Sequence, residues 1–363
     1  MRAKSSAQLP EDELLEIARG ILPNAIANLQ NKSIFLTGGT GLFGIWLLEF
    51  LSYLDSTGFG IGEIHILSRD PRNFLTKRQH LIGNKKFIWH QGDMTNFKLN
   101  VDDVSYAIHG AATSASETYA SYQNLKKFRE NIQSVENFLD NTTSQKIPRV
   151  MYISSGSVYG QTSSPHPKPL LEDNTSAPTT DNIGHSLGHA KRVGELLFFL
   201  RQEQTDYSFS IARCFSFVGP MIPLDIHYAV GNFLLNALRE EPIQIRGDGS
   251  AIRSYMYLGD LVIWLLTILL IGKSGQIYNV GSNESVTILQ LAMTVDSLSR
   301  TRAGIQTASL NKDYSYSSQR FYLPDISKAN RELSLKIQTP LKEALERTLN
   351  FYYANPKLWS KHS

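Results

Sequence analysis

Residues 33–44 read SIFLTGGTGLFG, an apolar strand that runs directly into a glycine-spaced turn, and a helical pattern follows at 45–53. A turn residue without a Cβ lets the backbone approach a pyrophosphate, and the helix start behind it supplies partial positive charge. Gly38, Gly41 and Gly44 have the spacing that these roles require, and the flanking strand and helix are the context that the motif needs. The stretch therefore predicts a dinucleotide-binding turn.

Short apolar runs alternate with helical patterns over the residues that follow this turn. Strands are predicted at 63–67, 86–89, 104–108, 149–154 and 208–214, and helices at 118–141 and 186–202. Strands that alternate with helices imply βαβ units and a mostly parallel sheet with right-handed crossovers. The sequence thus predicts an α/β Rossmann fold, a doubly wound parallel sheet with helices on both faces.

The chain is expected to divide into three parts. Residues 1–30 form an N-terminal helical extension with an amphipathic helix at 11–22, which packs either on its own domain or on a second subunit. Residues 31–215 form the dinucleotide-binding domain, and its polar stretch 161–182 is a candidate active-site loop. Residues 216–363 form mainly a smaller C-terminal α/β substrate lobe, some later segments of which return to the sheet. Its predicted helices are 229–238, 260–271 and 288–298, and its predicted strands are 243–245 and 276–280.

Composition limits the classes of protein to consider. The 363 residues are 42% hydrophobic with a net charge of +3, so nucleic acid is not indicated as a partner. The only cysteine, Cys214, excludes an internal disulfide and a cysteine-rich metal site, and we expect it in the core. The most apolar run, 261–271, is shorter than the roughly 20 residues of a membrane span and predicts a buried helix. Residues 1–10 lack a secretory pattern, so we expect a cytoplasmic protein. We also expect neither a membrane partner nor a bound metal.

Three motifs together resemble the extended short-chain dehydrogenase/reductase family, in particular its nucleotide-sugar epimerases, dehydratases and decarboxylases. They are TGGTGLFG at 37–44, SSGSVYG at 154–160 and KRVGE at 191–195, and shorter matches follow the family's order through DISK at 325–328. The resemblance extends from residue 33 to residue 354. It implies a Rossmann fold, NAD(P)(H) as cofactor and a nucleoside-diphosphate sugar as substrate. It also implies a homodimer formed through helices 118–141 and 186–202.

The resemblance assigns cofactor binding to the glycine-rich turn, to the ends of the following strands and to one helical lysine. These residues are Gly38, Thr40, Gly41, Leu42, Phe43, Gly44, Ser68, Arg69, Asp93, Met94, Ala111, Ala112, Asn131 and Lys191. An acid at the end of the second strand normally accepts a hydrogen bond from the ribose 2′-hydroxyl and selects NAD. Ser68 and Arg69 stand there instead, and a guanidinium suits a 2′-phosphate, so the sequence favours NADP(H). NAD remains an alternative if Asp70 turns inward.

The family's chemistry implies a serine that orients a sugar hydroxyl, a tyrosine that exchanges its proton, and a lysine four residues after the tyrosine. Ser155 and Lys191 match the serine and the lysine, whereas Leu187 stands at the tyrosine position. Leucine transfers no proton. His185 and His189 flank the gap and titrate near neutral pH, which makes them candidate catalytic residues. However, two positions from residue 187 they point to other faces of a helix.

The residues after the serine bear on the type of reaction. The resemblance implies an Asp-Glu pair there in dehydratases and a glutamate at position 157 in xylose-forming decarboxylases. Gly156 and Ser157 supply no carboxylate, so an epimerase or a ketoreductase is favoured. Tyr159 is interpreted as a structural tyrosine. The residues that the resemblance assigns to substrate binding are Thr113, Ser155, Ser157, Arg213, His227, Asn232 and Arg253.

The sequence therefore predicts an NAD(P)-dependent epimerase, or otherwise a reductase or dehydratase, that acts on a nucleotide sugar for polysaccharide or glycoconjugate assembly. One alternative is a non-catalytic protein that keeps both binding sites and has lost the redox step together with the tyrosine. A second alternative abstracts a proton beside an existing carbonyl, with a structural dinucleotide. The nucleotide and the sugar stay open.

Overall fold

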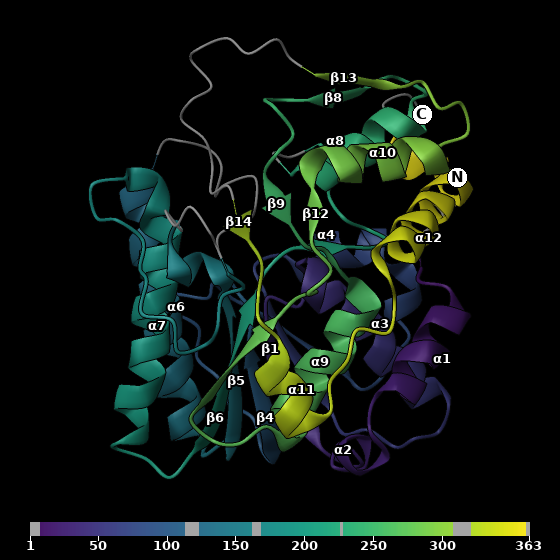
Figure 1. Cartoon of the computed structure of the whole chain (residues 1–363). Coiled ribbons are helices and arrows are strands. Elements are labelled where there is room, and N and C mark those ends of the chain that lie inside the picture. Colours follow the sequence, from purple (N-terminus) through teal and green to yellow (C-terminus); the bar gives the residue numbers. More distant parts are fainter. Residues whose placement is uncertain (1–7, 113–122, 162–167, 226–227, 308–320, 361–363) are drawn as a thin grey trace.

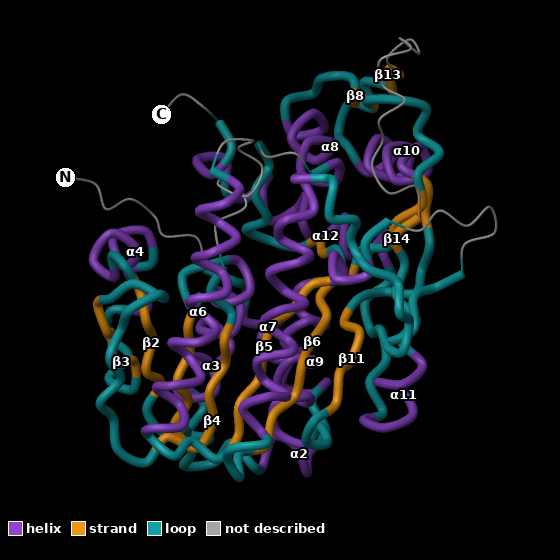
Figure 2. The backbone as a smooth tube through the Cα atoms, turned by 90° about the vertical axis from the view of Figure 1, so that its left-hand side faces the viewer, coloured by secondary structure: helices purple, strands orange, loops and turns teal. Residues whose placement is uncertain are grey.

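A computed structural model describes residues 8–112, 123–161, 168–225, 228–307 and 321–360. Its centre is a seven-stranded parallel sheet in the order β11-β6-β5-β4-β1-β2-β3. The strands are β1 (Ser33–Thr37), β2 (Ile64–Ser68), β3 (Phe87–Gln91), β4 (Val104–His109), β5 (Arg149–Ser155), β6 (Ser208–Cys214) and β11 (Gln276–Val280). Figure 2 shows these strands running side by side. The predicted doubly wound α/β fold is confirmed.

Helices cover both faces of the sheet (Figure 1). On one face lie α1 (Glu11–Gly20), α2 (Pro23–Ala27), α3 (Leu42–Ser56) and α9 (Leu258–Ile271), and on the other lie α6 (Asn124–Ser144) and α7 (Ser186–Gln202). Successive side chains of β1 point to opposite faces of the sheet. Ile34 and Leu36 belong to the buried cluster on one face, and Phe35 belongs to the cluster on the other. A strand buried on both faces reads as a continuous apolar run, as residues 33–36 do.

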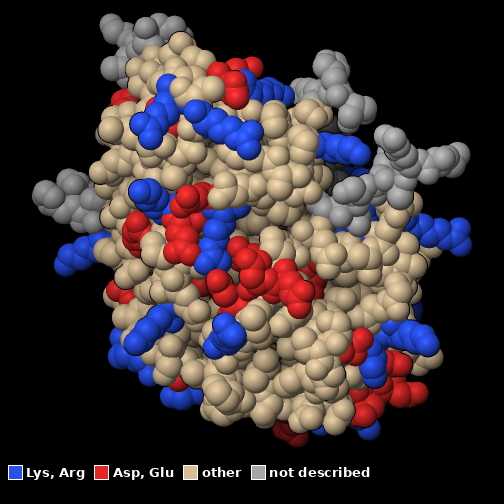
Figure 3. Space-filling model, turned by 90° about the vertical axis from the view of Figure 1, so that its right-hand side faces the viewer, with Lys and Arg blue, Asp and Glu red and all other residues tan. Residues whose placement is uncertain are grey.

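The N-terminal helix packs on its own chain. Helix α1 contacts α9 and α3, and its Leu14 and Ile17 are buried. Arg347 of α12 (Leu341–Ala354) pairs with Glu13 at 3.2 Å and with Glu16 at 2.6 Å. Figure 3 views the molecule from the side on which α1 and α12 lie in Figure 1, and it shows acidic and basic side chains gathered on that face. The helix ends at Gly20 rather than at residue 22, because the backbone turns extended before the proline that begins α2.

Later segments form a layer over the carboxyl ends of the strands (Figures 1 and 2). This layer contains α8 (Ala229–Leu238), α10 (Ile288–Leu298), β8 (Ile243–Ile245) and β13 (Ile305–Thr307). A small sheet joins β12 (Val286–Thr287), β9 (Ile252–Arg253) and β14 (Phe321–Tyr322). Strand β11 and helix α9 instead belong to the central sheet and its cover, as predicted for some of the later segments.

The remaining elements are short. They are α4 (Pro71–Lys77), α11 (Ser327–Leu333), β7 (Phe217–Val218), β10 (Met256–Tyr257), and the 3₁₀ turns η1 (Gln79–Leu81), η2 (Gly156–Tyr159), η3 (Ile183–His185) and η5 (Pro356–Leu358). The apolar run 261–271 lies in the buried helix α9, as predicted, and Cys214 is buried. Within the described ranges, none of the helices combines the length and apolarity that crossing a membrane requires. Residues 118–122 of one predicted helix lie outside the described residues.

A buried ion pair ties the sheet to α7. The Arg213 guanidinium on β6 donates to both carboxylate oxygens of Glu195, with Nη2 to Oε2 at 2.7 Å and Nε to Oε1 at 3.0 Å. Ser154 of β5 donates to the same carboxylate at 2.5 Å. Burial alone would lower the pKa of Arg213, but the hydrogen bonds and charge of Glu195 raise it above its ordinary value. Two strands and the lysine-bearing helix therefore meet at one charged group.

Breaking this ion pair is expected to destabilise the fold strongly. An Arg213→Met variant leaves the Glu195 carboxylate buried without its counter-charge, which costs about 3–5 kcal/mol. The free energy of unfolding from urea titration measures the loss. Lys126→Met is the control, since it removes only the exposed pair of Lys126 with Glu130, 3.7 Å apart, and should leave stability nearly unchanged. Equal losses in the two variants would contradict the structural role of Arg213.

Candidate active site

The glycine-rich turn brings the ends of β1 and β4 into backbone contact. Gly38 has a φ of +78°, and a Cβ placed on it would lie 2.5 Å from the Gly110 carbonyl. A Cβ on Gly44 would lie 2.3 Å from the Gly38 oxygen. Gly41 precedes α3, and in the described part of the chain its first turn receives no side-chain cap. The first N–H groups of α3 are therefore available to an anionic ligand, as a dinucleotide pyrophosphate requires.

The end of β2 forms the next part of the predicted cofactor site. Ser68 is buried, Arg69 is exposed, and Asp70 caps α4 by accepting from the Asn73 N–H at 3.0 Å. The Asp70 carboxylate is thus engaged at a helix start. Asp93 accepts from the Thr95 amide at 2.9 Å and from its hydroxyl at 2.7 Å. Burial raises the pKa of Asp93, but the Thr95 bonds and the charge of Arg69 lower it overall.

The other predicted cofactor residues follow the same edge of the sheet. The Ala111 N–H donates to Thr37 Oγ1 at 3.2 Å, and the Met94 carbonyl accepts from the Asn137 side chain at 3.3 Å. Asn131 is buried on α6, where its side chain donates to the Lys127 carbonyl at 2.8 Å. Four more of these residues are partly buried, namely Thr40, Leu42, Phe43 and Ala112.

Ser155, Ser157 and Lys191 lie at the carboxyl end of β5. The Ser155 hydroxyl accepts from the Ser157 N–H at 3.1 Å. The Ser157 hydroxyl oxygen is buried and has no hydrogen-bond partner among the described residues, so it is ready for a ligand. Lys191 donates to the Ile153 carbonyl at 2.8 Å and lies 4.7 Å from the centre of the Tyr152 ring. Burial lowers the pKa of Lys191 to about 8, although the nearby Cys214 and Glu195 oppose the shift.

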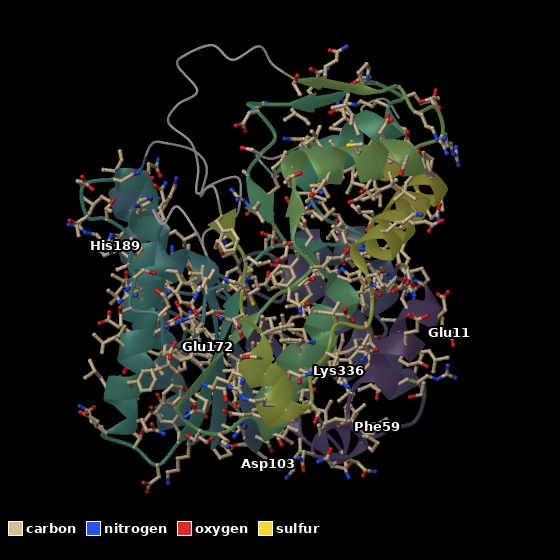
Figure 4. The ribbon with its side chains drawn as sticks, viewed as in Figure 1. Glu11, Phe59, Asp103, Glu172, His189 and Lys336 are labelled. Carbon is tan, nitrogen blue, oxygen red and sulfur yellow. The ribbon has the colours of Figure 1, made fainter. Side chains whose placement is uncertain are left out.

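The two candidate catalytic histidines both contact Thr179 rather than the serine and the lysine. His189 Nε2 lies 3.1 Å from the Thr179 carbonyl, and His185 Nδ1 lies 3.2 Å from the Thr179 hydroxyl. Figure 4 shows His189 toward the outer edge of the molecule. Within the described ranges, no hydrogen bond joins either histidine to Ser155 or Lys191. Their catalytic assignment stays a prediction.

The predicted substrate residues come from two regions. Arg253 on β9 is partly buried, and its guanidinium donates to the Ile252 carbonyl at 2.7 Å. Burial lowers the pKa of Arg253, and the nearby Tyr255 and Tyr322 raise it. Asn232 lies on α8, and Arg213 belongs to the buried ion pair. Two of the predicted residues, Thr113 and His227, lie outside the described residues.

Two side chains at this site were missed from the sequence. Glu172 lies in the predicted active-site loop and accepts from the Asn279 N–H at 2.9 Å, which fixes the loop to β11 (Figure 4). Tyr322 on β14 places its hydroxyl against Gly156, the residue after Ser155. Its place just before the DISK motif at 325–328 was the available signal, but a sequence alone does not show that this short strand reaches β5.

Comparisons with known proteins indicate the family of this chain. The pattern of the NAD dependent epimerase/dehydratase family matches residues 34–281. UDP-glucuronic acid decarboxylase 1 of Danio rerio is 28% identical over 332 residues, which cover 90% of this chain and 74% of the relative. UDP-glucuronic acid decarboxylase 6 of Arabidopsis thaliana is 27% identical over 316 residues, covering 87% of each chain.

Solved structures show the same fold. UDP-glucuronic acid 4-epimerase from Bacillus cereus, in complex with NAD, superimposes with a TM-score of 0.74 at 22% identity, covering 90% of this chain and 100% of that one. UDP-glucose 4-epimerase from Thermotoga maritima, with UDP-glucose, gives a TM-score of 0.74 at 19% identity, covering 89% and 99%. The family pattern spans most of the chain and includes both the glycine-rich turn and the Ser155–Lys191 region. The chain therefore belongs to the NAD-dependent epimerase/dehydratase family.

Proposed function

We propose that this protein is an NAD(P)-dependent enzyme that modifies a nucleoside-diphosphate sugar, as an epimerase or otherwise as a reductase or dehydratase, in polysaccharide or glycoconjugate assembly. The observation that carries the proposal is the meeting of the glycine turn, Ser155, Lys191 and the partly buried Arg253 at one end of the sheet. The relatives and structural neighbours described above are named as enzymes of UDP-sugars. The non-catalytic alternative is therefore not favoured.

The residues present fit a nicotinamide dinucleotide. Gly38 and Gly44 permit the close backbone packing of a dinucleotide turn, and Lys191 would hold the ribose beside the nicotinamide. When bound, the nicotinamide would accept a hydride from a sugar carbon and return it. Ser155 would orient the reacting sugar oxygen, and the Ser157 hydroxyl, which has no partner among the described residues, would bind a neighbouring polar group of the sugar.

Residues 156 and 157 favour an epimerase or reductase over a decarboxylase. The relatives in sequence are named as decarboxylases, yet this chain has no carboxylate at either position. A Cβ on Gly156 would lie 2.4 Å from the Tyr322 hydroxyl, so this position has no room for an acidic side chain. We also propose that Leu187 occupies the position of the family's tyrosine, since it lies one helical turn before Lys191 on the same face of α7.

A panel of nucleotide sugars tests the proposed function. The protein is incubated with UDP-, dTDP-, CDP- and GDP-sugars plus oxidised or reduced cofactor, and products are identified by mass spectrometry and NMR. Arg253→Met should weaken binding of the converted nucleotide sugar about tenfold or more in calorimetry, because a charge-assisted hydrogen bond to phosphate contributes about 1.5–3 kcal/mol. Arg246→Met, which removes an exposed arginine, is the control and should bind normally. No product from any sugar would refute the proposal.

We infer a preference for NADP(H) from the end of β2. Ser68 is buried, Asp70 is engaged with Asn73, and Arg69 is exposed where a 2′-phosphate would lie. A guanidinium attracts this phosphate, whereas a carboxylate would repel it. Neither Ser68 nor Arg69 supplies a carboxylate that could accept a hydrogen bond from the ribose 2′-hydroxyl of NAD.

Removing Arg69 should change cofactor selectivity. Arg69→Ala is expected to weaken NADP(H) binding about tenfold, which corresponds to about 1.4 kcal/mol, and to leave NAD(H) binding nearly unchanged. Fluorescence titration with each reduced cofactor measures both affinities. Arg72→Ala, another exposed arginine close by in sequence, serves as the control. Equal weakening of both cofactors, or tighter NAD(H) than NADP(H) binding by the unchanged protein, would argue against the preference.

We also propose a homodimer formed through α6 and α7. The two helices pack against each other along one side of the molecule (Figure 1). Together they expose several large apolar side chains, namely Leu125, Leu196, Phe199 and Leu200. A second copy of the same pair would bury these side chains in a four-helix contact.

A charge placed on this face should separate the subunits. Leu196 on α7 and Met293 on α10 are each 56% exposed, so they form a matched pair. Leu196→Glu is expected to change the mass in analytical ultracentrifugation from that of two chains to that of one, since burying an unpaired carboxylate is costly. Met293→Glu should stay dimeric. If the unchanged protein sediments as a monomer, the dimer proposal is wrong.

A further inference from the structure

Hydride transfer at a carbinol carbon needs a partner for the hydroxyl proton, and the usual position offers none. Leu187 lies one turn before Lys191 and has no ionisable group. Tyr159, which follows the serines, donates its hydroxyl to Asn279 at 2.7 Å. Tyr152 is fully buried beneath Lys191, and burial raises its pKa well above the ordinary value. These two tyrosines are therefore committed to the fold.

A third phenol reaches the reacting serine from a distant part of the chain. Tyr322 on β14 reaches Gly156, the residue that directly follows Ser155. Its hydroxyl oxygen lies 2.4 Å from the point where a Cβ on Gly156 would stand. The phenol therefore occupies the space that any larger residue at 156 would fill. The absence of a side chain at Gly156 is therefore what allows the Tyr322 hydroxyl to lie there.

Several contacts hold this phenol in place. Tyr322 pairs with Arg253 in the register of β14 and β9, and its ring lies 4.7 Å from the ring of Phe215. Directly after it, the Leu323 carbonyl accepts from the Leu170 N–H at 2.9 Å. The Asn279 side chain donates to the Leu170 carbonyl at 2.7 Å and thus joins this segment to β11. The Tyr322 ring is only partly buried.

We propose that Tyr322 is the catalytic group that exchanges a proton with the reacting oxygen of the sugar. This inference rests on the proposed function. In the oxidative direction the Tyr322 phenolate takes the hydroxyl proton of the sugar, while the hydride from the same carbon passes to the oxidised nicotinamide dinucleotide, leaving a keto sugar. In the reductive direction the Tyr322 hydroxyl would return the proton to the carbonyl oxygen, and the hydride would come from the reduced dinucleotide when it is bound.

The groups that face Tyr322 determine its resting protonation. Burial raises its pKa, the Ser155 side chain lowers it, Cys214 and Tyr228 raise it, and Arg253 lowers it. The net shift is upward, so Tyr322 rests as the neutral phenol. The reductive direction uses this phenol directly, whereas the oxidative direction needs the phenolate. Oxidation should therefore accelerate as pH rises, and Tyr322→Phe should abolish that dependence.

Removal of the hydroxyl is the direct test. Tyr322→Phe should reduce the turnover of whichever nucleotide sugar the unchanged protein converts by about 10²- to 10⁴-fold, the usual contribution of general acid–base catalysis. The dissociation constant of that sugar and the thermal unfolding midpoint should stay close to those of the unchanged protein. Tyr353→Phe is the matched control, because the Tyr353 hydroxyl contacts the Arg300 N–H at 3.4 Å on another part of the lobe.

Two further variants separate catalysis from structure. Gly156→Ala should displace the phenol and lower turnover while Tyr322 itself is retained. Leu187→Tyr combined with Tyr322→Phe should recover part of the lost activity, since it supplies a phenol one turn before Lys191. A fluorotyrosine at position 322 gives a readout without turnover, because its fluorine resonance should shift when the converted sugar binds and also in Gly156→Ala.

The outcomes distinguish the two proposals. If the unchanged protein converts sugars and Tyr322→Phe retains its rate and pH profile, the role of Tyr322 is overturned while the proposed function stands. A fluorine resonance that stays fixed when a converted sugar binds also overturns it. If the unchanged protein converts no sugar, the proposed function fails and this inference fails with it. Loss of turnover with intact binding and folding, together with a displaced resonance in Gly156→Ala, supports the catalytic role.

Discussion

The buried ion pair of Arg213 and Glu195 is the interaction on which the site depends. Its charges lie between β6 and α7, and Ser154 donates to the same carboxylate. Ser155 follows directly along the strand, and Lys191 lies one helical turn before Glu195. Any movement of α7 relative to the sheet would leave a charge unpaired in a low-dielectric interior, which costs several kcal/mol. The Arg213–Glu195 ion pair therefore holds Ser155 on β5 and Lys191 on α7 at a fixed distance from each other.

The same end of the sheet joins two different kinds of surface. On one side the backbone at Gly38 and Gly110 is packed so closely that side chains are excluded, which leaves N–H groups and space for a phosphate-bearing ligand. On the other side, β9 and β14 bring Arg253 and Tyr322 over the strand ends. Open α/β sheets bind ligands at this edge because the loops that leave the strands meet there. A dinucleotide and a sugar would thus meet above Ser155.

Much of this arrangement was predictable because its signals are local. The glycine turn, the strands of the central sheet and helices such as α7 and α8 follow from apolar periodicity and from glycine spacing within short windows. Helix α12 was missed although Leu341, Ala344, Leu345 and Leu349 repeat at helical spacing and are buried. The two-residue strands β9 and β14 have no periodicity to detect. They form only because the central sheet places their partners beside them.

The sequence by itself determined the fold class, the position of the dinucleotide turn and the absence of a proton-transferring group at residue 187, since each depends on residue type and near neighbours. Only the tertiary structure decided that Asp70 caps a helix, that Arg213 is held in an ion pair, and that a phenol from residue 322 lies against Gly156, next to Ser155. The physical reason is separation along the chain. Contacts between residues more than a hundred positions apart are selected by the packing of whole layers, which local patterns do not encode.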